Sequence, residues 1–493
     1  MSKQRRRFSH ILALFMAFTL VLTACGGSNN AAEPGDSDNA DDKPVELIWY
    51  TIGTPQKDVD KVMEEVSKYT KEKINATVKM KMVDWGDYPQ KMQVNVASGE
   101  PMDILFTASG GFDYVQNARK GAFLELDDLL TEYGKDLTAT INPAFLEGSK
   151  VDGHNYGIPA NKELPQQEVW RFNQTLLDKY NLDISGVRSL ESLEPLLKVI
   201  KEKEPSITPF AMDKNYVPYV PYDYVIQNLP MAVKLDTTDY KIVNILETPE
   251  MKEALTTMRK YYKAGYVSPE AATTGSTNDL TTSGKWFLDR AQTQPLADNL
   301  WSASYGYPVV STPASDAIIT NTSVQGSIMA ISANSEYPEK AMEFLNLLNT
   351  DPVLRNMVDS GIEGVHYKMV DDLHMENLPE SKNYDMPSYS LGNNMLLNLN
   401  SNDPDDKWDQ FKKFNEEGVN SPILSFNFDA SNVSAELTAV QNVKEQYWAA
   451  LMTGTLDPET NLDQVIEKFN QAGLEKVMAE AQTQLDAWRA ANQ

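Results

Sequence analysis

The stretch from residue 45 to residue 109 constrains the fold most, because short apolar runs alternate there with segments of helical periodicity. Apolar runs occupy residues 45–53, 75–83 and 102–109. Between the first two, apolar side chains recur at helical spacing opposite a charged face, namely at Val59, Val62, Met63, Val66 and Tyr69. Residues 88–100 again have a helical pattern. Strand–helix–strand–helix–strand predicts a parallel sheet in an α/β domain.

Two details of this stretch lead to further expectations. Thr54 precedes Pro55, a common signal for a helix start, so we expect the first helix to begin there. Ligands of parallel sheets bind beyond the carboxyl ends of the strands. Those ends are residues 51–54, 84–85 and 107–111 in this chain.

The N-terminus has the pattern of an export signal. Residues 1–10 carry four basic and no acidic side chains, and the apolar run that follows is shorter than the ~20 residues of a membrane span. Residues 22–25, Leu-Thr-Ala-Cys, resemble the bacterial lipobox, in which the cysteine takes a diacylglycerol and cleavage falls just before it. We therefore expect a signal peptide at 1–24 and a lipid on Cys25. An ordinary secreted chain with an incidental cysteine is the alternative.

Composition limits the remaining possibilities. Residues 25–43 are mostly Gly, Asn, Asp and Ser, which predicts a disordered tether. About 450 residues follow, enough for two domains. Without the four basic residues of the leader, 40 Lys and Arg face 70 Asp and Glu, a net charge of −30 that argues against nucleic acid. With no cysteine after Cys25, structural disulfides are excluded.

The mature chain lacks the usual motifs of catalysis and metal binding. It has three histidines, and it contains no HExxH, GxSxG or GxxxxGK[ST] motif. Acidic pairs at 127–128, 371–372 and 405–406 lie in polar stretches, which favours solvated surface. We expect no cofactor, no metal and no catalytic residues, although two distant carboxylates of a glycosidase would escape a single sequence.

A series of motifs resembles the extracellular solute-binding proteins of bacterial ABC importers, most closely the large Gram-positive lipoproteins that serve oligosaccharide importers. After the lipobox and tether come the motifs IWYTIG, VASGEPMDILFTASGGF, NARKGAFLELDDLL, YGIPANKE, LLDKYNLD, SGKWFLDRA, NSEYPEKAMEFLNLLNTDP, SGIEGVHY and NQAGLEKVMAEAQTQLDAW. The resemblance covers nearly the whole mature chain in consistent order.

The resemblance implies a fold of two α/β lobes with a ligand cleft between them. Lobe one would hold residues 44–162 and 318–360, and lobe two would hold residues 163–317 and 361–493. The motif at 361–367 would then lie where the chain crosses back to lobe two.

Sugar recognition requires flat aromatic platforms beside planar polar groups. At the strand ends of lobe one, the candidates are Thr51, Asp84, Trp85, Thr107 and Ser109. In lobe two, the candidates are Trp170, Tyr216, Tyr219, Tyr222, Arg290 and Gln292. Trp170 alternates with Arg171, so the sequence leaves open whether it faces a cleft or the core.

The motif GIEGVHY supplies the last candidates, namely Glu363, His366 and Tyr367. Gly361 and Gly364 bracket Glu363, which is typical of a special turn. A structural hinge, with Glu363 capping backbone amides, is as consistent with this pattern as ligand contact.

The sequence thus predicts a monomeric binding protein, lipid-anchored on the outer face of the cell membrane, that captures an oligosaccharide by hinge closure and delivers it to ABC permease subunits. A peptide-binding importer lipoprotein is the nearest alternative. A glycoside hydrolase and an adhesive surface lipoprotein are the alternatives from other classes.

Overall fold

The computed structural model describes residues 43–492. The expected signal peptide, the lipid site at Cys25 and nearly all of the expected tether therefore lie outside the described residues. Within residues 43–492, no helix combines the length and apolar character needed to cross a membrane.

The first lobe is built on a five-stranded sheet in the order β2-β1-β3-β15-β6. Its strands are β1 (Val45–Ile52), β2 (Ala76–Val83), β3 (Ile104–Thr107), β15 (Ile328–Ile331) and β6 (Gly157–Pro159). Strand β1 pairs in parallel with both β2 and β3, as the alternation of residues 45–109 predicts. Strand β15 joins antiparallel between β3 and β6. A return segment from far along the chain thus completes the first sheet.

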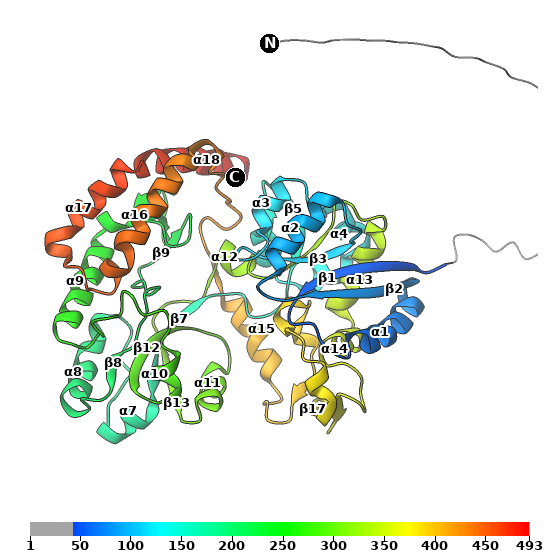
Figure 1. Ribbon diagram of the computed structural model, residues 1–493, viewed down its shortest axis with the longest axis horizontal. Coiled ribbons are helices and arrows are strands. Elements are labelled where there is room, and N and C mark those ends of the chain that lie inside the picture. Colours follow the sequence, from blue (N-terminus) through cyan, green and yellow to red (C-terminus); the bar gives the residue numbers. More distant parts are fainter. Residues whose placement is uncertain (1–42, 493) are drawn as a thin grey trace, which may run out of the picture. The chain divides into compact units, whose positions relative to one another are not determined.

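Helices cover both faces of this sheet (Figure 1). They include α1 (Val59–Ile74), α2 (Tyr88–Ser98), α13 (Pro338–Thr350) and α14 (Pro352–Ser360). The predicted start of the first helix at Thr54 is wrong, because α1 begins at Val59. The segment before it is a loop instead, in which the Asp58 amide donates to the Asn383 carbonyl over 3.1 Å. This contact from a distant part of the chain outweighs the local start signal.

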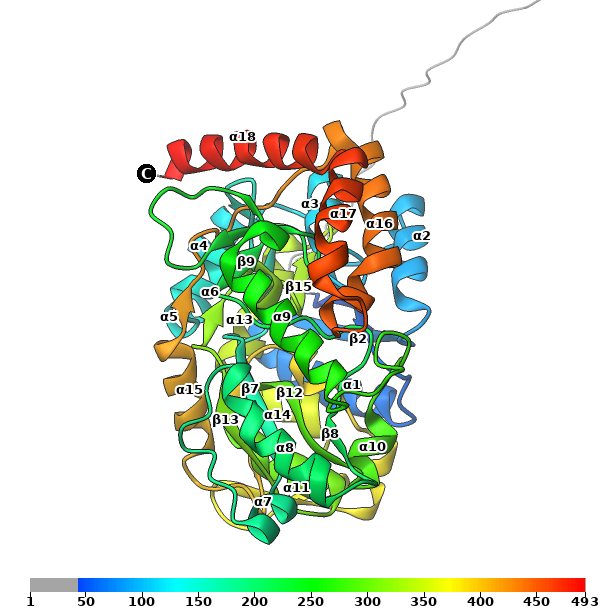
Figure 2. The ribbon, with the colours of Figure 1, turned by 90° about the vertical axis from the view of Figure 1, so that its left-hand side faces the viewer.

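The second lobe is built on a four-stranded sheet in the order β13-β7-β12-β8. Its strands are β7 (Gln167–Asn173), β8 (Thr208–Phe210), β12 (Trp286–Thr293) and β13 (Val309–Pro313). Its helices include α7 (Gln174–Tyr180), α8 (Glu194–Lys203), α9 (Pro249–Lys263), α16 (Ser434–Met452), α17 (Pro458–Gln471) and α18 (Leu474–Asn492). Figure 2 shows α16 and α17 lying side by side next to α9.

Each lobe has its own hydrophobic core. In the first, Trp49 packs edge-to-face on Phe344 of α13, with ring centroids 5.5 Å apart. Four apolar positions on one face of that helix, Ala341, Phe344, Leu345 and Leu348, are all fully buried. In the second, residues from β7, β8 and the C-terminal helices form one continuous cluster. The two largest hydrophobic clusters of the described residues thus lie in different lobes.

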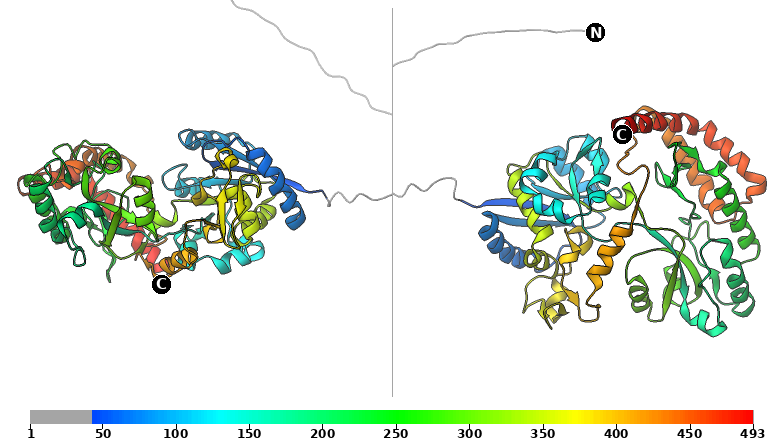
Figure 3. Two further views of the ribbon diagram at one scale, coloured as in Figure 1. Left: turned by 90° about the horizontal axis from the view of Figure 1, so that it is seen from below. Right: turned by 180° about the vertical axis from the view of Figure 1, so that it is seen from behind.

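Three chain segments that link the two sheets pair with one another. Gln166 and Ile318 exchange backbone hydrogen bonds of 2.7 and 2.8 Å. Beside them β14 (Ile318–Ile319) pairs in parallel with β19 (Val419–Asn420). Figure 3 shows the segment after α15 (Lys407–Glu417) continuing from there to the C-terminal helices. We call these three paired segments the hinge ribbon.

The third crossing lies later in the chain than expected. Beyond residue 361, Tyr384, Met386, Leu391 and Leu424 still belong to the core of the first lobe, whereas Ile423 and Phe426 belong to the second. The expected assignment of residues 361–493 to lobe two is therefore wrong for residues 361 to about 422. The motif GIEGVHY is a turn within the first lobe, because its His366 contacts Asp58 in front of α1 and its Ile362 packs against the core of that lobe.

The other elements are short. Near the N-terminal sheet they are α3 (Tyr114–Arg119), α4 (Asp127–Tyr133), α5 (Lys135–Thr140), α6 (Pro143–Gly148), β4 (Lys150–Val151), β5 (His154–Asn155) and α12 (Asn321–Val324). Around the second sheet they are η2 (Glu191–Leu193), β9 (Tyr222–Tyr224), β10 (Met231–Lys234), β11 (Val243–Asn244), η3 (Ile245–Glu247), α10 (Asn278–Thr282), α11 (Ala297–Tyr305) and η7 (Ser431–Val433). After α14 come β16 (Tyr367–Met369), β17 (His374–Asn377), η4 (Pro379–Asn383), η5 (Ser388–Ser390), η6 (Asn394–Leu396) and β18 (Leu399–Asn400).

Candidate functional site

The carboxyl ends of β1, β2 and β3 lie at one edge of the first sheet, because the three strands are parallel neighbours. Asp84, Trp85 and Ser109 are exposed at this edge. Thr51 and Thr107 are completely buried. The Thr107 hydroxyl donates to the Phe112 carbonyl over 2.5 Å, which fixes the turn that follows β3. The two threonines therefore shape this edge from inside, and they are not positioned to contact a ligand.

Trp85 forms an aromatic platform with Tyr389. Their ring centroids are 6.3 Å apart at an interplanar angle of 22°, a stacked arrangement. Trp85 is 43% exposed and Tyr389 is 39% exposed. Large aromatic faces are normally buried, and open ones are typical of ligand or partner contact. The sequence indicated Trp85 from its loop context, whereas nothing local in the chain marked Tyr389.

In the second lobe, four of the predicted residues surround one pocket of about 230 Å³. These are Tyr219, Tyr222, Arg290 and Gln292. We call it the tyrosine pocket. Other polar residues of its lining, which sequence reasoning missed, are Glu168, Asn215, Asp223, Gln227 and Asn228. Tyrosine rings beside amide, carboxylate and guanidinium groups are the surface that sugar rings and hydroxyls need.

Ion pairs and hydrogen bonds order the polar wall of the tyrosine pocket. Arg290 Nε lies 3.1 Å from Glu168 Oε2, and Gln292 Nε2 donates to Glu168 Oε1 over 3.3 Å. The two groups come from β12 and the carboxylate from β7, which are antiparallel partners. Adjacent strands of the sheet thus present the Gln292 amide, the Glu168 carboxylate and the Arg290 guanidinium at the same end.

Asp223 connects the tyrosine pocket to the hinge ribbon. It lies in β9, and its carboxylate accepts a hydrogen bond from the hydroxyl of Ser421, directly after β19. Burial raises the pKa of Asp223 from its ordinary value of 3.8 to about 6, and the Ser421 hydroxyl opposes that rise only in part. Within residues 43–492, no basic side chain offsets the desolvation of this acid, so its protonation state is sensitive to pH.

Helix α12 connects the hinge ribbon to the edge of the first lobe. Thr320, its N-cap, lines the tyrosine pocket. At its other end the Gln325 carbonyl accepts from the Ser109 amide over 2.9 Å. Asn321 donates to the Ile423 and Phe426 carbonyls. The tyrosine pocket and the Ser109 turn are therefore joined by a single turn of helix, which brings candidates from both lobes to one region.

Trp170 lies in the core of the second lobe. It is 2% exposed, its indole nitrogen donates to the Arg188 carbonyl over 3.0 Å, and its ring packs edge-to-face on Phe210. The predicted cleft position is wrong because β7 is an inner strand covered on both faces. On the other face, Arg171 pairs with Asp289 and lies 4.7 Å from the ring centre of Trp301.

Tyr216 is also part of the wall behind the pocket and not of its surface. Its ring packs edge-to-face on Phe210, and the guanidinium of Arg290 lies 5.2 Å from its centre. Burial raises the pKa of the Tyr216 phenol. Of the three tyrosines that recur at intervals of three, Tyr219 and Tyr222 line the pocket and Tyr216 supports Arg290 from behind.

The motif GIEGVHY has a structural role. Nδ1 of the fully buried His366 accepts from the Ile362 amide over 2.9 Å, and Nε2 lies 3.2 Å from Asp58 Oδ2. A Cβ on Gly361, whose φ is +83°, would lie 2.5 Å from that Nδ1, so glycine is required there. Glu363 is exposed and Tyr367 is nearly buried, both away from the tyrosine pocket. The expected ligand contacts of this motif are therefore not brought to the site.

A larger pocket of about 530 Å³ is lined by residues of both lobes. Its lining includes Glu163, Gln294, Leu300 and Trp408. None of the predicted site residues contributes to it. The tyrosine pocket is the better candidate, because it combines two tyrosines with an ordered polar wall and adjoins the hinge ribbon.

Comparison with known proteins places this geometry in a family. A family model described as a bacterial extracellular solute-binding protein matches residues 65–366. The chain belongs to that family. A second model, described as a domain of unknown function, matches residues 422–490. The solute-binding fold that the motifs indicated is therefore confirmed.

A curated sequence and a crystal structure, both from Streptococcus pneumoniae, resemble the chain over almost their full length. A carbohydrate ABC transporter substrate-binding protein is 36% identical over 493 residues, which cover 98% of both chains. The crystal structure of the N-glycan transport solute-binding protein NgtS is 35% identical, covers 92% of this chain and 100% of its own, and has a TM-score of 0.83. The same protein in complex with Man5GlcNAc is 36% identical with the same coverage and a TM-score of 0.68.

These relatives confirm the predicted class of function. The chain is a bacterial extracellular solute-binding protein, and the relative at 36% identity is described as the substrate-binding protein of a carbohydrate ABC transporter. The relatives are described as binding proteins of transporters, not as enzymes.

Proposed function

We propose that this solute-binding protein captures an N-glycan-type oligosaccharide and presents it to an ABC permease. The observation that carries the proposal is the tyrosine pocket, in a chain that resembles NgtS over the full length of NgtS. The structure of NgtS has been solved in complex with Man5GlcNAc. A branched glycan offers many hydroxyls around apolar ring faces. Tyr219 and Tyr222 supply ring contacts, and Arg290, Gln292 and Glu168 supply directional polar contacts.

The exposed Trp85–Tyr389 platform supplies the contact from the first lobe. Ligand between the platform and the tyrosine pocket favours a closed arrangement, since only that arrangement lets both surfaces contact one glycan. The fall in TM-score from 0.83 to 0.68 between the two NgtS structures supports a change of arrangement between them.

Isothermal titration calorimetry of the mature protein with Man5GlcNAc tests the proposal. We expect one glycan per chain, a higher Tm with glycan present, and an intact glycan after prolonged incubation, as judged by mass spectrometry. Maltopentaose and a pentapeptide serve as comparison ligands. Tighter binding of the peptide would favour the peptide importer, and cleavage of the glycan would favour the hydrolase; either result overturns the proposal.

A further inference from the structure

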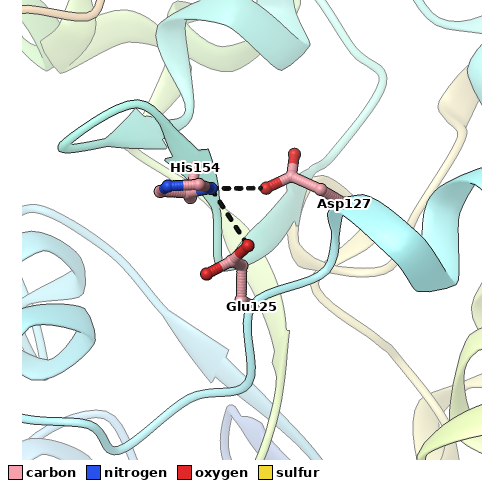
Figure 4. Close-up of side chains that lie close together, drawn as sticks. All are labelled: Glu125, Asp127 and His154. Atoms are coloured by element: carbon pink, nitrogen blue, oxygen red, sulfur yellow. Dashed lines mark hydrogen bonds and ion pairs between the residues drawn. The ribbon is translucent and has the colours of Figure 1, made fainter.

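Three side chains that could bind a metal ion converge on the surface of the first lobe, outside the tyrosine pocket. His154 Nδ1 lies 3.0 Å from Glu125 Oε1 and 3.0 Å from Asp127 Oδ2 (Figure 4). The three donor atoms lie within 4.8 Å of one another. They come from two separate chain segments, the loop that enters α4 and the strand β5, so local sequence does not bring them together.

The backbone holds the two segments in place. The hairpin of β4 and β5 turns at Asp152 and Gly153, both with positive φ, which are +52° and +97°. This is the tight two-residue connection that Asp-Gly favours. The Leu126 amide, between the two acidic residues, donates to the Asn155 carbonyl, next to His154, over 2.7 Å. Main-chain contacts therefore hold the two segments, and with them the backbones of the three residues, next to each other.

A buried amide also orients one of the carboxylates. Asn155 is 6% exposed, and its Nδ2 donates to Asp127 Oδ1 over 3.3 Å. Its own Oδ1 accepts from the hydroxyl of the fully buried Ser149 over 2.9 Å. Oδ2 of Asp127 is left to face His154. Hydrogen bonds of this kind to the non-ligating oxygen are typical of metal sites.

We propose that Glu125, Asp127 and His154 bind a divalent transition-metal cation, with Zn²⁺ as the best match. One imidazole nitrogen and two carboxylate oxygens form a donor set suited to zinc and not to Ca²⁺ or Mg²⁺, which prefer oxygen alone. Ligands that are each about 2.1 Å from zinc lie roughly 3.0–3.5 Å apart, which agrees with the two distances from Nδ1.

The side chains of Glu125, Asp127 and His154 are 50%, 39% and 51% exposed. Water can therefore complete the coordination, and the ion can enter directly from solvent. The bound cation would also offset the repulsion between two carboxylates held close together. By linking the hairpin to the start of α4, it would stabilise the first lobe.

Calorimetric titration of ZnCl₂ into tag-free, EDTA-treated mature protein tests the site. We expect one zinc ion per chain, a rise of Tm with zinc, and little heat from CaCl₂. Affinity should fall as the pH is lowered, because protons compete with metal for imidazole. His154→Ala and Asp127→Asn should each weaken binding by about tenfold or more.

Two control variants separate this site from incidental binding. Asp128→Asn changes the exposed neighbour of Asp127, and His374→Ala removes another histidine that pairs with a carboxylate, Asp371. Both should bind zinc as the unchanged protein does. No saturable binding to the unchanged protein would leave an ordinary histidine–carboxylate ion pair and overturn the proposal. Equal affinity in Asp127→Asn and Asp128→Asn would overturn it as well. Glycan binding plays no part in either result.

Discussion

At the scale of single residues, the two tryptophans that were candidates for ligand contact have opposite environments. Trp85 follows β2 in an exposed loop and stacks on Tyr389, whereas Trp170 lies in the middle of β7. The loop position of Trp85 could be predicted from the acidic residues and glycine around it. The burial of Trp170 could not, because a strand covered on both faces has no polar side to contrast with its apolar one.

The two residues therefore give opposite predictions. Trp85→Ala should weaken glycan binding by about tenfold or more, on the order of 1–3 kcal/mol, with an unchanged Tm in the absence of ligand. Trp170→Ala should lower the free energy of unfolding by roughly 3–5 kcal/mol, because it leaves a cavity against Phe210. Calorimetry at a temperature where both variants are folded measures their affinity for glycan. Thermal unfolding without glycan measures their stability, and the two results together distinguish a ligand contact from a core residue. A normal affinity in Trp85→Ala would exclude the platform from the site.

At the scale of secondary-structure elements, the parallel order of β1, β2 and β3 could be predicted from periodicity alone. The start of α1 and the turn at GIEGVHY could not be placed. The Asp58 carboxylate in front of α1 contacts His366, 308 positions further along the chain. Such contacts between distant segments decide where an element begins, and a single sequence does not show them. For the same reason, the positions of Tyr389 and Asp223 at the candidate site could not be predicted.

The contact between β9 and the hinge ribbon predicts a dependence of stability on pH. The pKa of Asp223 is about 6 in the folded protein, above its ordinary value of 3.8. The folded state therefore binds more protons than the unfolded state between these values. The stability from this group is fully present below about pH 3.8 and is lost as the pH rises through 6.

Asp223→Asn removes this titration. The variant should match the unchanged protein near pH 4 and be more stable at pH 7, by up to roughly 2–3 kcal/mol. Urea unfolding at several pH values between 4 and 7 measures the difference. Asp236→Asn, at an exposed acid near the end of β10, is the control and should show no such trend. A constant difference between Asp223→Asn and the unchanged protein across this range would contradict the assignment.

At the scale of the whole molecule, the two-lobe fold could be predicted because length, patterning and motif order all agreed. The third crossing could not, since residues 361 to 422 carry no periodic signal that assigns them to either sheet. The hinge ribbon is held by backbone hydrogen bonds between three short segments, so side-chain patterns do not reveal it. The tyrosine pocket could be predicted in part, because Tyr219 and Tyr222 belong to a stretch rich in tyrosine and proline that cannot form a regular helix.

We expect a lipid on the N-terminal cysteine to retain the whole molecule at the cell surface. We propose that Cys25 carries a diacylglycerol, since it follows the lipobox-like residues 22–24 directly after a short apolar run. Each buried methylene contributes about 0.8 kcal/mol, so two acyl chains anchor a protein stably where one does not. Without Cys25 the chain has no sulfur to which the diacylglycerol can be attached, and it lacks the residue before which the signal peptide is cleaved.

Cys25→Ser should therefore appear in the culture medium or remain with its signal peptide uncut. Fractionation of cells, followed by mass spectrometry of the N-terminal peptide, distinguishes these outcomes, and Ser28→Ala serves as the control that should stay membrane-bound and processed. If Cys25→Ser were still in the membrane fraction with its leader removed, another feature of the chain would have to retain it. The net charge of −30 makes that unfavourable, because bacterial membrane surfaces are themselves acidic and repel such a chain.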